Sequence, residues 1–317
     1  MASVLVTGGA GFIGSHLCER LLSEDNGVVC LDNFNDFYPE AIKRQNIVDC
    51  LKDKNFSLEE IDLLDADGLD RLFSKKNIEK IIHLAAYAGV HPSIKNPRLY
   101  CEANVTGTVN LLEVARKNEI KNFVFGSSSS IYGINSKMPF NEEDFVGTPI
   151  SPYAASKRSG ELLCHVYGHL YGLNIACLRL FTVYGPRQRP DLAIHKFTKL
   201  IDSGASINMY GDGSSARDYT YVADILNGIM AAFEKEFRFE IINLGNEHPI
   251  KLKRMIEVIE ESLQKKAKIN QMPDQPGDVP ITYADIGKAK KMLNYQPTVS
   301  IEDGIKRFVE WYKESDK

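Results

Sequence analysis

The sequence predicts an α/β protein built on an open, doubly wound parallel sheet. Short runs rich in β-branched residues alternate with amphipathic, helix-length stretches through the first 180 residues. Strands that alternate with helices of this length indicate βαβ units, in which helices cover both faces of a parallel sheet. Beyond a Pro-, Gly- and Arg-rich stretch at 184–190, helices with few strands are expected.

The patterns place the elements of the first region. We expect strands at 3–7, 28–32, 56–62, 78–84, 122–127 and 174–180. Helical patterns fill the gaps, at 12–23, 40–53, 67–76, 95–118 and 152–171. A later run at 241–244 is expected to return to the sheet, so a smaller C-terminal substrate domain should be interleaved with the first. The expected domains are 1–180 with about 222–245, and 181–221 with 246–317.

Composition limits the partners of this 317-residue chain. With 38 basic and 42 acidic side chains its net charge is −4. Nucleic acid is therefore not expected as a partner, because binding to phosphate backbones normally requires a basic excess. No signal peptide and no run of 18 apolar residues is found, so no membrane partner is expected. Six scattered cysteines without a C-x-x-C pair predict reduced thiols, a cytoplasmic location and no metal site.

The first expected strand runs directly into a glycine loop, and a helical pattern follows it. The glycines are Gly8, Gly11 and Gly14, with the spacing G-x-x-G-x-x-G. Such a turn lets a helix N-terminus receive a pyrophosphate, whereas a turn of purely structural origin is the weaker alternative. Asp32 ends the next strand eighteen residues later, where a carboxylate accepts ribose hydroxyls. Asn33 follows in place of a cation, so a Rossmann-type domain that binds NAD rather than NADP is predicted.

A tyrosine and a lysine lie four residues apart on one face of the helix expected at 152–171. They are Tyr153 and Lys157, and Ser151 with Pro152 indicates the helix start. Ionising a phenol near pH 7 requires about 4 kcal/mol, which a close ammonium and a cationic nicotinamide ring can supply. The phenolate could then take a proton from a sugar hydroxyl while hydride leaves the same carbon.

Tyr-x-x-x-Lys alone is common on helices. Its weight comes from four consecutive serines, 127–130, at the carboxyl edge of the expected sheet, where open α/β proteins bind ligands. A solvated loop is the alternative interpretation of these hydroxyls.

From Val4 to Trp311 the sequence resembles the extended short-chain dehydrogenase/reductase superfamily, specifically its nucleotide-sugar 4-epimerases. The matching segments are Gly8 to Gly14, 32–33, 62–63, 83–86, Asn104, 127–133, 153–157, 217–218 and 276–278. The resemblance implies a UDP-sugar substrate, bound NAD and a homodimer with contacts at 95–118 and 152–171. It implies Ser128, Tyr153 and Lys157 as catalytic residues. The implied NAD-binding residues are Gly8, Gly11, Phe12, Ile13, Gly14, Asp32, Asn33, Asp62, Leu63, Leu84, Ala85, Ala86, Asn104, Tyr153, Lys157 and Phe181.

Within the superfamily, the stretch at 180–193 is similar to UDP-glucuronate 4-epimerases. Galactose-type epimerases usually have Asn where Thr182 stands. The implied substrate-binding residues are Ser128, Ser129, Ser130, Thr182, Arg189, Arg217 and Asp278, of which Ser129, Ser130, Thr182 and Arg189 would surround a uronate carboxylate. Related dehydratases and decarboxylases carry acidic residues just after the catalytic hydroxyl, and here those positions are serines.

Three positions depart from the family patterns. His91 stands where uronate epimerases often have Arg, and Gln275 replaces a diphosphate-binding Arg of galactose-type epimerases, so Arg217 would carry more of that task. Thr282 stands where a Tyr often restricts the pocket, so a larger group at carbon 2 is compatible. The alternatives are therefore a UDP-glucose or UDP-N-acetylglucosamine 4-epimerase and, less favoured, a non-catalytic NAD-sensing protein.

Other features have plainer interpretations. Arg189 or Arg217 could pair with Asp191 or Asp218 at the surface instead of binding an anion. His83 is expected to be a packed core residue. The series formed by Glu161, His165 and His169 is expected to have a surface or subunit-contact role.

Overall fold

The computed structural model describes residues 3–135, 137–273 and 279–315. The chain divides into two compact units, the first made of 1–134, 144–179 and 229–242 and the second of 135–143, 180–228 and 243–317. The expected roles of the two regions, one for the dinucleotide and one for the sugar nucleotide, remain predictions.

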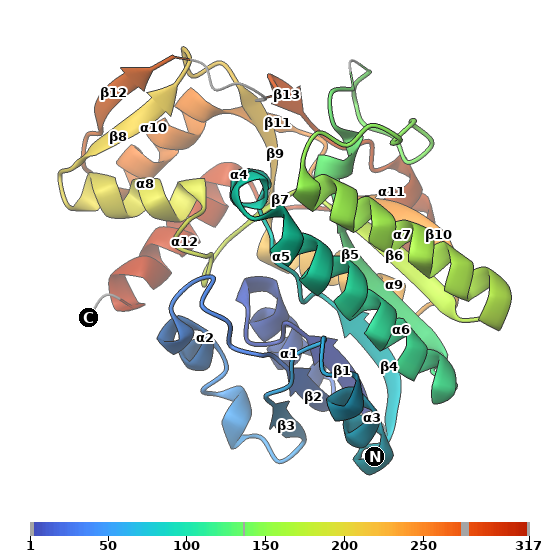
Figure 1. Ribbon diagram of the computed structural model, residues 1–317. Helices are drawn as coiled ribbons and strands as arrows, with labels where there is room; N and C mark the ends of the chain where they lie inside the picture. Colours follow the sequence, from blue (N-terminus) through green and yellow to red (C-terminus); the bar gives the residue numbers. More distant parts are fainter. Residues whose placement is uncertain (1–2, 136, 274–278, 316–317) are drawn as a thin grey trace. The chain divides into compact units, whose positions relative to one another are not determined.

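A seven-stranded sheet organises the first unit (Figure 1), which confirms the predicted fold class. Its order is β10-β6-β5-β4-β1-β2-β3. The strands are β1 (Ser3–Thr7), β2 (Gly27–Leu31), β3 (Phe56–Glu59), β4 (Ile78–His83), β5 (Asn122–Ser128), β6 (Asn174–Leu180) and β10 (Glu240–Leu244). Every residue of β2 and β5 is buried, as expected for parallel strands covered on both faces.

Helices connect these strands. They are α1 (Phe12–Ser23), α2 (Glu40–Asn46), α3 (Ala66–Lys75), α4 (Val90–Lys95), α5 (Pro97–Cys101), α6 (Gly107–Lys117), α7 (Pro152–Tyr171) and α9 (Val222–Phe233), with short turns η1 (Cys50–Lys52), η2 (Glu102–Thr106) and η3 (Ser129–Tyr132). In Figure 1, α6 lies between α3 and α7, and both neighbours pack against it.

The strand order reverses between β1 and β4. Thr7 at the end of β1 lies opposite Leu31 of β2 on one side and His83 of β4 on the other. The loops that follow two such strands leave in opposite directions, which opens a crevice for ligands at the carboxyl edge. The glycine loop and the loop at 84–89 therefore flank the expected binding position.

The helix predicted at 95–118 is helical without a break from Pro97 to Lys117, but it contains a π-helical turn. Pro97 begins α5, because proline has no N–H to continue the hydrogen bonding of α4. Residues 102–106 then form a π-helical turn before α6 begins. The helix expected at 40–53 is shorter than predicted, because it ends at Asn46 and is followed by η1.

The expectation of few strands after residue 180 is wrong. The described part of the second unit contains β7 (Thr182–Tyr184), β8 (Ser206–Tyr210), β9 (Ala216–Tyr221), β11 (Pro249–Lys251), β12 (Lys268–Met272) and β13 (Ile281–Thr282). These strands are short, and β12 is mostly exposed, so they lack the long apolar runs that reveal buried strands. The helices of this unit are α8 (Ala193–Asp202), α10 (Leu252–Leu263), α11 (Gly287–Leu293) and α12 (Ile301–Ser315).

Among the described residues, none of the helices combines the length and the apolar character needed to cross a bilayer.

Helix α7 begins and ends where its sequence predicts. The Ser151 hydroxyl caps it by accepting a hydrogen bond from the N–H of Ala154, and Gly172 ends it in the left-handed conformation. In its middle, Gly160 faces β5, and a Cβ there would collide with the ring of Phe125. The missing side chain therefore lets α7 lie close to β5.

We expect Gly160→Ala to lower the free energy of unfolding by about 1–3 kcal/mol, because the added methyl group overpacks the contact with Phe125. The higher helix propensity of Ala offsets only about 1 kcal/mol of this. Urea denaturation measures the change, with Ser159→Ala at the neighbouring, more exposed position as the matched control. A Gly160→Ala protein as stable as the wild type would contradict the close packing.

Candidate active site

The glycine loop has the geometry that a bound pyrophosphate needs. Gly8 has a φ of 68°, and a Cβ there would lie 2.9 Å from the backbone of Ala85. A Cβ at Gly14 would collide with the carbonyl oxygen of Gly8. At Gly11, by contrast, a Cβ would meet only the Gly8 carbonyl at 3.1 Å and the Tyr38 hydroxyl at 3.9 Å. One side of the loop is therefore open for a phosphate group at the start of α1.

The acidic residue after β2 is held in place by this loop. Asp32 accepts hydrogen bonds from the N–H groups of Ala10 (3.2 Å) and Phe34 (3.0 Å), and burial raises the pKa of its carboxyl. Asn33 donates to a carboxylate oxygen of Asp62 at 2.7 Å, so two residues predicted at the adenosine end lie together. A carboxylate that can accept hydrogen bonds, followed by a position without a cation, fits an unphosphorylated ribose better than a phosphorylated one.

The remaining predicted NAD-binding residues of the first unit lie at the start of α1 and on the loops after β3 and β4. Phe12 is buried and Ile13 half-buried at the start of α1, whereas Leu63 packs against Gly107 of α6. The N–H of Leu84 donates to the carbonyl of Thr7 at 3.2 Å, so the loop after β4 begins against β1. Ala85 and Ala86, half-buried, follow in that loop.

His83 is buried in a chain of hydrogen bonds behind this loop. Its Nδ1 lies 2.7 Å from the Thr7 hydroxyl, and its Nε2 lies 2.9 Å from the Thr108 hydroxyl. Thr108 donates its own proton to the carbonyl of Asn104, so Nε2–H must donate to Thr108 and Nδ1 must accept from Thr7. The Thr7 oxygen in turn accepts from the N–H of Ala85. His83 is a core residue, as expected, and burial lowers its pKa to about 3.

Asn104 connects the loop after β4 to helix α7. Its side chain accepts from the N–H of Tyr87 (2.8 Å) and donates to the carbonyl of Tyr87 (2.9 Å) and to the hydroxyl of Ser156 (3.0 Å). Ser156 in turn donates to the carbonyl of Tyr153. Asn104, predicted to contact NAD, lies in the π-helical turn and thus shapes the loop after β4.

The predicted catalytic residues stand on α7 and at the end of β5, two elements in contact. The ammonium of Lys157 is fully buried, donates to the carbonyl of Gly126 at 2.7 Å and lies 5.1 Å from the ring centroid of Phe125. Burial lowers the pKa of Lys157 to about 8. Tyr153 is half-buried, with its ring in edge contact with Tyr100.

Ser128 ends β5 and caps η3. Its hydroxyl lies 3.0 Å from the hydroxyl of Ser130 and accepts from the N–H of Ser130. Ser129 and Ser130 are half-buried in η3, which packs against α7. The predicted serines therefore lie at the end of β5 and in η3, two elements that both contact α7.

The other predicted substrate residues belong to the second unit. Thr182 begins β7 and is half-buried, whereas Arg189 donates two hydrogen bonds to the carboxylate of Asp191, at 2.9 and 2.7 Å. The alternative prediction, in which Arg189 pairs with Asp191, is therefore confirmed. Phe181, predicted to contact NAD, is buried and packs against Phe140.

The second alternative, an ion pair of Arg217 with Asp218 at the surface, does not fit Asp218, which is fully buried. The guanidinium of Arg217 donates to the carbonyls of Ala216 (2.9 Å) and Pro280 (3.3 Å). Asp218 instead accepts from buried backbone N–H groups, among them that of Ala284. Asp278 and the Gln275 departure lie outside the described residues, and the His91 departure is exposed on α4.

The prediction of a surface or subunit-contact role is wrong for Glu161. It is fully buried, not at the surface, and its carboxylate pairs with Arg179 of β6. The four-residue spacing from Lys157 already placed it on the inner face of α7, but nothing local identified its partner. His165 and His169 of the same series are exposed.

We expect the neutral state of His83 to make stability depend on pH. Below about pH 6.5 the unfolded imidazole takes up a proton that the folded one refuses, so the free energy of unfolding falls as pH falls, by about 1.4 kcal/mol per unit. The measurement is urea denaturation of the wild type and His83→Gln between pH 6.5 and 4. The two stability curves should converge towards acid, whereas parallel curves would contradict a buried neutral histidine.

Comparison with known proteins places this geometry in a family. Residues 5–308 match the family model described as GDP-mannose 4,6 dehydratase. The UDP-glucuronate 4-epimerase of Thermodesulfobacterium geofontis is 46% identical over 99% of this chain and 97% of its own. The crystal structure of the Bacillus cereus UDP-glucuronic acid 4-epimerase in complex with UDP-glucuronic acid and NAD matches with a TM-score of 0.92 and 38% identity, over 99% of this chain and all of that one. That of the Thermotoga maritima UDP-glucose 4-epimerase with UDP-glucose also matches with a TM-score of 0.92, at 33% identity over the whole of both chains. The chain therefore belongs to the GDP-mannose 4,6 dehydratase family of the extended short-chain dehydrogenases/reductases, together with these epimerases.

Proposed function

We propose that the protein is an NAD-dependent UDP-sugar 4-epimerase that interconverts UDP-glucuronate and UDP-galacturonate through a 4-keto sugar. The observation that carries the proposal is the buried ammonium of Lys157, held at the end of β5 one helical turn beyond Tyr153. The T. geofontis and B. cereus relatives, both named for UDP-glucuronate or UDP-glucuronic acid epimerisation, support the reaction and the sugar.

The chain's own residues fit NAD. We assign the pyrophosphate to the open side of the glycine loop at Gly11, the adenosine ribose to Asp32, and the nicotinamide ribose to Lys157. The fit rests on the space beside Gly11 and on the absence of a cation at Asn33. When bound, NAD supplies a reversible hydride acceptor for carbon 4 of the sugar.

The side chains of α7 and β5 would manage the proton of the 4-hydroxyl group. Tyr153 takes this proton as a phenolate, which the ammonium of Lys157 stabilises. Because the pKa of Lys157 is about 8, this residue is still mostly protonated at pH 7. The Ser128 hydroxyl completes the site by hydrogen bonding to the reacting oxygen. After the keto sugar turns over about its diphosphate, Tyr153 returns the proton, and the configuration at carbon 4 is inverted.

A uronate substrate creates a specific hazard, because its 4-keto form is a β-keto acid and can lose carbon dioxide. We propose that hydroxyls of Ser129, Ser130 and Thr182 hold the carboxylate in an orientation that disfavours this loss, and that Arg189 neutralises it. Arg189 already binds Asp191, but a guanidinium has five N–H donors and can serve two carboxylates. Positions 129 and 130, where related dehydratases and decarboxylases carry acidic residues, are serines here and supply no acidic group for dehydration.

A second candidate is 4-epimerisation of UDP-glucose or UDP-N-acetylglucosamine. Thr282, half-buried in β13, is small enough to leave room for a group at carbon 2, and the T. maritima neighbour was crystallised with UDP-glucose. In that case the task of binding the diphosphate would still fall to Arg217.

We also propose a cytoplasmic homodimer. Leu162, Val166 and Leu170 form an exposed apolar stripe at four-residue spacing along α7, which suits a helical contact between two copies of the chain. The six unpaired cysteine thiols are consistent with a reducing compartment.

We expect the purified wild type to convert UDP-glucuronate without added NAD, and Tyr153→Phe to lower kcat by about 10²–10⁴-fold, because the phenol that moves the proton is gone. Chromatography of the sugar nucleotides measures both. Tyr167→Phe, on the same helix and away from the proposed base, is the matched control and should stay near the wild-type rate. Failure of the wild type to epimerise UDP-glucuronate, UDP-glucose or UDP-N-acetylglucosamine would contradict the function, and an active Tyr153→Phe would contradict the base.

The sugar preference is tested by Thr182→Val and Arg189→Ala. We expect both to slow UDP-glucuronate turnover by about tenfold or more, corresponding to the loss of one charged or neutral hydrogen bond, and to leave UDP-glucose turnover nearly unchanged. Released UDP-pentose, detected by mass spectrometry, would report decarboxylation. If neither variant alters the rate or the product ratio, the carboxylate assignment is wrong.

A further inference from the structure

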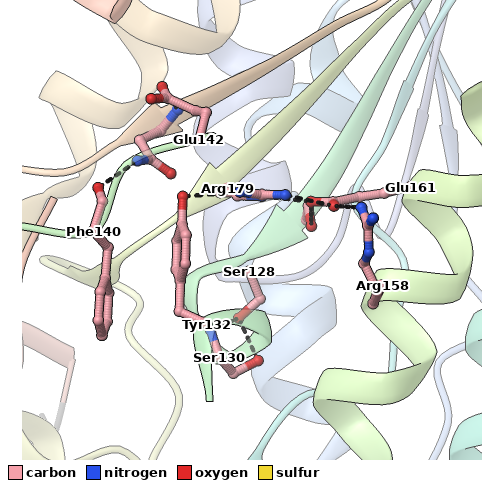
Figure 2. Close-up of polar contacts among 10 residues, drawn as sticks. Ser128, Ser130, Tyr132, Phe140, Glu142, Arg158, Glu161 and Arg179 are labelled. Atoms are coloured by element: carbon pink, nitrogen blue, oxygen red, sulfur yellow. Dashed lines mark hydrogen bonds and ion pairs between the residues drawn. The ribbon is translucent and has the colours of Figure 1, made fainter. Parts of the chain in front are cut away.

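A buried ion pair lies in the first unit beside the proposed active site, and the mechanism above does not use it. The carboxylate of Glu161 on α7 accepts two hydrogen bonds from the guanidinium of Arg179 on β6, at 2.9 and 3.0 Å. Their side chains are 0% and 1% exposed. Arg158, partly exposed on the same helix, adds a third hydrogen bond to Glu161 at 2.9 Å (Figure 2).

The pair is attached to the chain on both sides of the serine hydroxyls. The hydroxyl of Ser127, one residue before Ser128, donates to Glu161 at 2.6 Å. Arg179 donates to the hydroxyl of Tyr132 at 2.9 Å, and its guanidinium lies 4.9 Å from the centroid of that ring. Figure 2 shows Arg179 between Tyr132 and Glu161, with Ser128 and Ser130 beside them. The segment 128–130 is therefore fastened immediately before and shortly after its three hydroxyls.

The same pair fixes helix α7. Glu161 lies one turn beyond Lys157 and about two turns, or roughly 12 Å, beyond Tyr153 on one continuous helix. A bidentate contact between a guanidinium and a carboxylate permits few relative orientations. Movement of the serine segment along α7 would therefore break hydrogen bonds at both Ser127 and Tyr132.

Stability alone gives little reason for such a pair. Taking two charges out of water carries a large desolvation penalty, and apolar pairs of similar size are often as stable or more stable. What an apolar pair cannot provide is the directional link to the two hydroxyl groups that flank residues 128–130.

On the basis of the proposed function, we propose that Glu161 and Arg179 are positioning residues that hold the Ser128–Ser130 hydroxyls in register with Tyr153 and Lys157. In the proposed mechanism the pair touches neither substrate nor cofactor. Its effect on the reaction comes through the placement of hydroxyl oxygens, for which an error of about 1 Å can cost a factor of about 100 in rate.

The decisive variant is Glu161→Met combined with Arg179→Met, which replaces the ion pair by apolar side chains without leaving a buried charge. We expect this protein to fold with a melting temperature near that of the wild type and to keep its KM for UDP-glucuronate, whereas kcat falls about 10–100-fold. If the pair served only structure, a double variant with the melting temperature of the wild type would also have its kcat. That result would overturn the proposal.

A smaller change covers the case in which the double variant does not fold. Tyr132→Phe removes only the hydroxyl group that Arg179 binds, so the protein should fold and should show a lower kcat at unchanged KM. The matched control is Asp70→Ala with Lys117→Ala, which removes an exposed ion pair between α3 and α6 of the same unit. Wild-type kcat in Tyr132→Phe would overturn the proposal.

Hydrogen–deuterium exchange separates this inference from the function on which it rests. We expect backbone amides at 127–132 to exchange faster in Tyr132→Phe and in the double methionine variant than in the wild type or the control. Unchanged exchange would contradict the fastening of this segment, whatever the activity. A wild type without epimerase activity would instead refute the function, and the exchange result would still stand.

Discussion

The close contact between α7 and β5 is the constraint on which the rest of the site depends. Gly160 gives up a side chain so that the helix can lie against Phe125, and this proximity carries Lys157 into the interior, where its ammonium meets the carbonyl of Gly126. The burial that results lowers the pKa of Lys157 to about 8 without making it neutral at pH 7. A helix held further away would leave the same lysine in water, with an ordinary pKa and no fixed relation to Tyr153.

Polar contacts in the first unit then fix the two neighbours of this helix. On one side the chain of hydrogen bonds from Thr7 through His83 and Thr108 ends at Asn104, whose amide binds both the loop after β4 and Ser156 of α7. On the other side the Glu161–Arg179 pair binds the serine segment. Both networks are buried and directional, which suits the proposed reaction, because that reaction depends on the placement of a phenol, an ammonium and a hydroxyl.

Local sequence patterns were sufficient to predict much of the fold and part of the candidate site. The strands at 3–7 and 174–180 and the helices at 12–23 and 152–171 have the predicted bounds, because periodicity and caps lie within each segment. The glycine loop and the Tyr153–Lys157 spacing were equally readable. The burial of Glu161 could not be predicted, because its partner Arg179 lies on a strand elsewhere in the sequence. The π-helical turn at Asn104 could not be predicted either, because it involves tertiary contacts with Tyr87 and Ser156. The short strands after residue 180 carry too few apolar residues to be seen in sequence.

The central proposal is that Ser128, Tyr153 and Lys157 act together on the 4-hydroxyl group of a UDP-sugar. A crystal structure with NAD and UDP-glucuronate tests it most directly. The account predicts that the hydroxyl oxygens of Ser128 and Tyr153 both lie within hydrogen-bonding distance of the sugar 4-oxygen, with Lys157 against the nicotinamide ribose. A complex in which the 4-oxygen contacts neither hydroxyl, or in which Lys157 stays bound only to Gly126, would contradict it.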